Sequence, residues 1–140
     1  CFDAILVGSG TALADNPRLD CRLWPGGEAP RPVVLDRRGR VPDTARMLRR
    51  PRAIALRDYT DLPDAMHRLY KAGITSLMVE GGAEVLRSFI AADMWDAARI
   101  ETAPRAFGAA GIAPAPAMPC APLDIEHIDG SIVTTYTRGL

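Results

Sequence analysis

The feature that most constrains the fold is a set of short, largely apolar runs, each stopped by a glycine or an acid. Residues 4–7 end at Gly8, residues 32–35 end at Asp36, and residues 76–79 end at Glu80. Apolar runs of this length without polar alternation are typical of strands buried on both faces, as in a parallel sheet. The sequence therefore predicts an α/β fold with a mostly parallel central sheet.

Helical segments alternate with these runs. Residues 53–56 form a further predicted strand, and residues 62–70 then place apolar side chains at helical spacing. Thr60 or Asp61 can cap this helix, and Gly73 is suited to the position just beyond its end. A second helix is predicted after Gly82. Strand–helix alternation of this kind favours helices that flank the sheet.

The C-terminal part has a different pattern. A fifth strand is predicted over residues 97–102, followed by a proline-rich loop. Asp129-Gly130 separates the strand-like runs 123–128 and 132–137, and this dipeptide is a strong hairpin signal. We expect the hairpin to close the sheet as an antiparallel C-terminal edge.

Composition narrows the function classes. The 140 residues fit a single domain, and a formal net charge of zero does not indicate a nucleic-acid partner. No apolar run is long enough to cross a membrane. The three cysteines have no paired spacing, so we expect free thiols in the reducing cytoplasm. No metal-ligand spacing is present, so no metal is expected.

Polar and glycine-rich residues follow three of the predicted strands, at residues 8–15, 36–37 and 80–82. Ligands of open α/β sheets bind beyond the carboxyl ends of the strands. If these strands are neighbours, the three segments lie side by side and line one site.

The segment Glu80-Gly81-Gly82 has two interpretations that the residues leave equally open. Two glycines before a helix allow close backbone approach, and the helix N-terminus attracts a pyrophosphate or a 2′-phosphate. A tight strand-to-helix turn without a ligand explains the glycines equally well. Glu80 can accept hydrogen bonds from a substrate, or it can pair with a nearby arginine.

Residues 8–15 offer a second candidate turn. The Thr11 hydroxyl and the Asp15 carboxylate can contact a ribose or an amide, but such residues also cap helices. Arg22 can clamp a phosphate, although the residues alone favour a solvated surface charge. No nucleophile–base set is visible around His67 or His127. This profile favours an enzyme whose cofactor supplies the reaction.

Three segments together resemble a known family: DAILVGSGTALADNPRLDCR at 3–22, RPVVLD at 31–36 and MVEGGAEVL at 78–86. They are similar to the reductase domain of the bacterial riboflavin-biosynthesis enzyme RibD. The resemblance implies a dihydrofolate-reductase-like fold and a homodimer. It also implies reduction of 5-amino-6-(5-phosphoribosylamino)uracil to the ribitylamino product with NADPH. The hydride would reach C1′ of the ring-opened ribose.

The resemblance also implies roles for individual residues. Asp15 and Glu80 are the candidate catalytic residues, with Asp15 or an ordered water as the proton donor. Arg37 stands where the family often has a serine, and an arginine there could meet a 2′-phosphate. The implied substrate contacts are Leu19, Arg22 and Glu80. The implied cofactor contacts are Thr11, Asp15, Arg37, Gly82, Ala83, Glu84, Val85, Leu86, Arg87 and Ser88.

The family domain normally begins with an earlier strand that is not found here. The resemblance therefore predicts a single reductase domain over residues 1–140, truncated at its N-terminus and weakly active or inactive alone. Two alternatives remain open. One is a non-catalytic nucleotide-binding module, and the other is a dihydrofolate-reductase-like enzyme that acts on a pterin.

Overall fold

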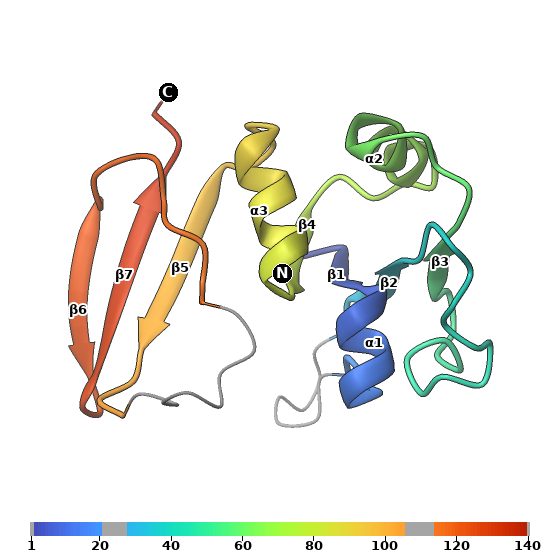
Figure 1. Ribbon diagram of the computed structural model, residues 1–140, viewed down its shortest axis with the longest axis horizontal. Helices are drawn as coiled ribbons and strands as arrows, with labels where there is room; N and C mark the ends of the chain where they lie inside the picture. The colour runs from blue at the N-terminus through green and yellow to red at the C-terminus, as the bar shows by residue number, and fades with distance from the viewer. Residues whose placement is uncertain (1, 21–27, 106–113, 140) are drawn as a thin grey trace. The chain divides into compact units, whose positions relative to one another are not determined.

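The structure is a computed structural model that describes residues 2–20, 28–105 and 114–139 (Figure 1). The chain divides into two compact units, Cys1–Leu86 and Arg87–Leu140. Each unit has a sheet of its own, and the two sheets differ in strand direction and burial.

The first unit contains a four-stranded sheet in the order β3-β2-β1-β4. Every ladder in it is parallel, as predicted. All five residues of β1 are buried, and four of the five in β2 are buried. This burial explains the apolar runs without alternation. The strands are β1 (Ala4–Gly8), β2 (Arg31–Leu35), β3 (Ile54–Leu56) and β4 (Leu77–Gly81).

Three helices follow strands of this sheet: α1 (Ser9–Asp15), α2 (Leu62–Lys71) and α3 (Ala83–Ala91). The Asp61 carboxylate caps α2 by accepting a hydrogen bond of 2.8 Å from the N–H of Asp64. Gly73 follows α2 with φ of 82°, and its N–H bonds to the Tyr70 carbonyl. Both predicted ends of α2 are therefore confirmed, because the glycine adopts the left-handed conformation that closes a helix.

The second unit contains an antiparallel sheet in the order β5-β7-β6. Its strands are β5 (Ala97–Thr102), β6 (Asp124–Ile128) and β7 (Ser131–Thr137). Asp129 and Gly130 have φ of 49° and 85°, so the predicted hairpin turn is confirmed. The hairpin pairs with β5 in a second sheet, whereas a single sheet was expected. Exposed and half-buried residues alternate over the first four positions of β5, which suits a half-exposed antiparallel strand.

A compact core supports the carboxyl edge of the parallel sheet. Asp36 is buried directly after β2, and its carboxylate accepts hydrogen bonds of 2.9 Å from the N–H groups of Arg40 and Val41. This carboxylate therefore fixes the turn that leads into the core. The core cluster contains Val7, Ala12, Val34, Val41, Ala45 and Met47, with Leu19, Leu48 and Ala55 packed against it.

Candidate functional site

The pairing of β1 with β4 is interrupted at Glu80. Leu6 pairs with Val79, but the next residue, Val7, pairs with Gly81. Glu80 is thus an extra residue in β4, a β-bulge. Bulges redirect side chains and are common beside active sites. The bulge leaves the Glu80 side chain exposed at the carboxyl edge of the sheet.

The glycines beside this bulge allow very close packing. A Cβ on Gly8 would lie 2.6 Å from Cγ2 of Val85, in the first turn of α3. A Cβ on Gly82 would lie 3.0 Å from Oγ1 of Thr11, and Gly82 has φ of 76°. The Thr11 hydroxyl therefore lies against the turn between β4 and α3. Two sequence-predicted cofactor contacts, Thr11 and Gly82, are brought together in this way.

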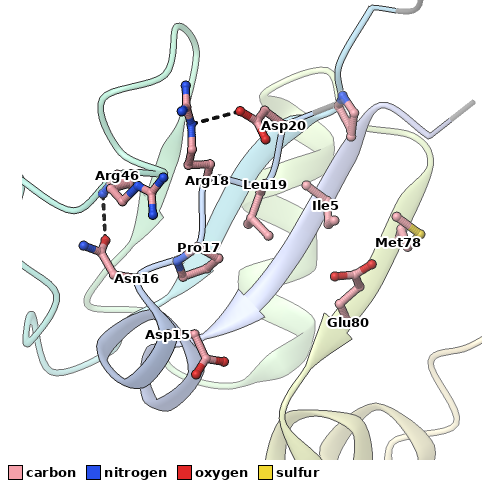
Figure 2. Close-up of a pocket in the computed structure, with 11 residues that line it drawn as sticks. Ile5, Asp15, Asn16, Pro17, Arg18, Leu19, Asp20, Arg46, Met78 and Glu80 are labelled. Carbon is pink, nitrogen blue, oxygen red and sulfur yellow. Dashed lines mark hydrogen bonds and ion pairs between the residues drawn. The ribbon is translucent and has the colours of Figure 1, made fainter. Parts of the chain in front are cut away.

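A pocket of about 550 Å³ is lined by residues of β1, β4 and the loop after α1 (Figure 2). This volume is typical of small-molecule sites. The pocket brings together three predicted site residues, Asp15, Leu19 and Glu80. Its other lining residues are Ile5, Asn16, Pro17, Arg18, Asp20, Pro30, Arg46 and Met78.

The loop after α1 forms one wall of the pocket and is firmly held. Asn16 adopts a left-handed conformation with φ of 43°, and its Oδ1 accepts a 2.9 Å hydrogen bond from the N–H of Arg46. The Arg50 guanidinium donates to the carbonyl of Leu19. Nε of Arg18 lies 3.0 Å from Oδ2 of Asp20. These contacts fix the wall without using Asp15 or Glu80.

The two candidate catalytic carboxylates have no hydrogen bond or ion pair with the rest of the described chain. The salt bridge considered for Glu80 is therefore not seen in residues 2–20, 28–105 and 114–139. Helix capping does not explain Thr11, because α1 begins at the N-cap Gly8 and has no side-chain capping bond. The pocket thus has carboxylates available for a ligand.

The sequence matches the family model of the RibD C-terminal domain over residues 2–127. This match covers most of the chain. The chain belongs to the RibD C-terminal domain family. The predicted family is therefore confirmed.

Individual proteins similar to this chain carry related names. A riboflavin biosynthesis protein RibD from Bacillus amyloliquefaciens is 35% identical over 130 residues, which cover 74% of this chain and 35% of that protein. A 2,5-diamino-6-ribosylamino-4(3H)-pyrimidinone 5′-phosphate reductase from Archaeoglobus fulgidus is 32% identical over 135 residues, or 73% of this chain and 62% of that one. This chain therefore spans less than two thirds of either relative.

The fold is shared with a solved RibD-type structure. The Thermotoga maritima diaminohydroxyphosphoribosylaminopyrimidine deaminase/5-amino-6-(5-phosphoribosylamino)uracil reductase superimposes with a TM-score of 0.77 and 25% identity. The match covers 96% of this chain and 44% of that protein. The predicted RibD-like α/β fold is thus confirmed.

The remaining predicted RibD site residues lie in different places. Arg37 does not line the pocket; its guanidinium lies over the Tyr59 ring, 5.7 Å from the centroid. Ala83–Ser88 occupies the first two turns of α3, where Arg87 donates a 3.2 Å hydrogen bond to the carbonyl of Pro114. Arg22 lies outside the described residues.

Sequence reasoning missed two structurally important residues of this RibD-family chain. Arg46 lines the pocket, but no local motif marks it. Asp3 accepts hydrogen bonds from the N–H groups of Thr75 and Ser76 and from the Thr75 hydroxyl. These bonds lower the pKa of Asp3 to about 2 and join the start of β1 to the segment before β4. A polar residue at the start of a buried strand was the available signal for Asp3.

Three further structural features concern metal binding, membrane-spanning helices and the cysteines. Across the described ranges, no group of three or more His, Cys, Asp or Glu side chains could hold a metal ion. None of the described helices is both long and apolar enough to span a membrane. Cys120 is an exposed free thiol, as expected, whereas Cys1 and Cys21 lie outside the described residues.

Proposed function

We propose that the chain is a reductase domain of riboflavin biosynthesis. It would reduce 5-amino-6-(5-phosphoribosylamino)uracil to the ribitylamino product with NADPH. The observation that carries this proposal is the pocket that brings Asp15, Leu19 and Glu80 together over one face of the parallel sheet. Membership of the RibD family supports this proposal. The name of the Thermotoga maritima protein gives this substrate, and the name of the Archaeoglobus fulgidus protein gives a related ribosylaminopyrimidinone phosphate.

The turn between β4 and α3 fits a dinucleotide. Gly82 has a positive φ, and its missing side chain lets the Thr11 hydroxyl lie close to the turn. The N-terminus of α3 offers free N–H groups and a positive dipole end to a pyrophosphate. Ala83–Ser88 would hold the phosphates, and Arg37 would contact the 2′-phosphate. NADPH, when bound, supplies the hydride.

The pocket residues would orient the substrate. The Glu80 carboxylate accepts hydrogen bonds from the ribose hydroxyls, and the bulge directs it there. Leu19 provides an apolar contact, and Arg22 contributes a charged one. The proton that must accompany the hydride at the reduced sugar would come from Asp15 or from an ordered water. The residues of the chain thus bind and orient, while the reducing equivalent comes from the cofactor.

The proposal includes a cytoplasmic homodimer, as the family resemblance implies. The side chains of Ile125 and Ile132 are 55% and 39% exposed and lie on the same face of the antiparallel sheet. Exposed apolar side chains that share a face favour association. Light scattering coupled to size-exclusion chromatography should give a dimer mass. Ile125→Lys should shift that mass toward a monomer, and a wild-type monomer at micromolar concentration would contradict this part of the proposal.

The reaction is tested by following nicotinamide absorbance with the ribosylaminouracil substrate. We expect NADPH oxidation that requires the substrate, at a low rate for the 140 residues alone. Gly82→Val should weaken NADPH binding more than substrate binding, because it introduces a side chain at a positive φ beside Thr11. NADPH binding without oxidation would instead indicate a non-catalytic module. Oxidation with dihydrofolate alone would indicate a pterin reductase.

A further inference from the structure

We infer that Arg46 recognises the phosphate group of the substrate, at the part of the pocket away from Glu80. This inference rests on the proposed function and adds a specificity-determining residue to it. Arg46 lies outside the segments that carry the RibD resemblance, and it reaches the site only through the tertiary fold.

Arg46 supplies an uncompensated cation to the pocket. Its side chain is exposed and lines the cavity, and it has no hydrogen bond or ion pair with any other described side chain. Arg18, the other arginine in the lining, already pairs with Asp20 at 3.0 Å. Arg46 therefore provides the unpaired positive charge of the described pocket wall.

The backbone beneath Arg46 is firmly anchored. Its neighbours Ala45 and Met47 are buried in the core cluster, and its own N–H donates to Oδ1 of Asn16. The guanidinium thus extends from a rigid turn. A binding group on a rigid support loses less conformational freedom when its ligand arrives.

Arg46 and Glu80 lie on opposite sides of the pocket, and Asp15 lies at the end of α1. In Figure 2, Arg46 and Asn16 lie on one side of the lining, and Glu80 and Met78 of β4 lie on the other. A phosphate placed beside Glu80 would be repelled, whereas a guanidinium can bind it with two parallel hydrogen bonds. A phosphorylated sugar therefore fits in one direction, with its phosphate toward Arg46 and its hydroxyls toward Glu80.

Calorimetric titration of the full chain with ribose 5-phosphate and with ribose tests the inference without NADPH. The wild type should bind ribose 5-phosphate more tightly than ribose. Arg46→Met should weaken ribose 5-phosphate binding roughly 10- to 100-fold, the loss expected for hydrogen bonds to a charged group, and should leave ribose binding unchanged. Arg46→Lys should recover part of the loss, because it restores the charge without the planar fork.

Arg49→Met is the matched control. Arg49 lies three residues further along the chain and is exposed, but it does not line the pocket. The Arg49→Met variant should bind ribose 5-phosphate like the wild type. If Arg46→Met does not fold, Arg46→Gln replaces it. Equal ribose 5-phosphate affinity in wild type and the Arg46 variants would overturn the inference, and so would a wild type that binds both sugars equally.

A failure of the proposed reductase activity would be recognised separately, as an absence of substrate-dependent NADPH oxidation. With an active enzyme, Arg46→Met should raise the KM for the phosphorylated substrate and leave the KM for its dephosphorylated form unchanged. An equal change for both forms would contradict a phosphate contact.

Discussion

The parallel and antiparallel sheets of this chain differ in how deeply their strands are buried. Every residue of β1 is buried, whereas every residue of β6 is exposed. The parallel strands are held on both sides, and their carboxyl ends can therefore carry a bulge and close glycine contacts at fixed positions. The antiparallel sheet exposes isoleucines and has a simple hairpin turn. The first unit therefore contains the candidate site, and the second exposes apolar surface.

The largest expected effect tests this difference in burial by comparing a core substitution with a surface substitution. Leu6 of β1 is fully buried, and Ile125 of β6 is 55% exposed. Leu6→Ala should lower the free energy of unfolding by about 2–5 kcal/mol through lost burial and a cavity. Ile125→Ala should change it by about 0.5 kcal/mol or less. Urea unfolding measures both, and comparable losses would show that the two sheets are equally buried in solution.

The second prediction concerns the carboxylates of the two sheets. Glu80→Gln should raise the KM for the substrate or lower its kcat/KM by roughly 10- to 100-fold, with NADPH affinity unchanged. The control is Glu126→Gln in β6, where the carboxylate lies 3.9 Å from Arg99 in an exposed ion pair. That variant should keep wild-type kinetics. Equal kinetics for both variants would remove Glu80 from the proposed site.

The third prediction compares two glycines of the first unit, one tightly packed and one with open space around it. Gly8→Ala places a methyl group 2.6 Å from Val85, so it should destabilise the fold by about 1–3 kcal/mol. Gly10→Ala meets nothing within 4 Å and lies inside α1. It should stabilise the helix by about 0.5–1 kcal/mol. Thermal unfolding distinguishes the two, and a neutral Gly8→Ala would mean that α3 moves away easily.

The smallest expected effect appears only in acid. Hydrogen bonds from Thr75 and Ser76 favour the ionised form and lower the pKa of Asp3 from 3.8 to about 2. Between these values the unfolded chain binds more protons than the folded chain, so stability falls as pH falls. The contribution of Asp3 is complete above about pH 4 and is lost through about pH 2. The advantage of wild type over Asp3→Asn in urea unfolding should shrink over this range. A pH-independent difference would exclude this linkage.

Much of the fold follows from local patterns. The unbroken apolar runs predicted the parallel strands, and Asp61 and Gly73 predicted the two ends of α2 because caps are local hydrogen-bonding features. Asp129-Gly130 predicted the hairpin because only a few residues adopt two successive positive φ values easily. The pairing of β5 could not be predicted in this way, because a strand carries no local signal of its partner.

The candidate site likewise combines features that the local sequence predicts with features that depend on the fold. The sequence by itself determined that polar and glycine-rich segments end three strands, and it singled out Asp15 and Glu80. The family resemblance added Leu19. Tertiary structure decided that Glu80 is a bulge, that Thr11 meets Gly82, and that Arg46 joins the pocket. The reason is physical. Turn and strand preferences act between neighbours in the chain, whereas a bulge, a close contact and a distant arginine depend on which strands pair and how the core packs.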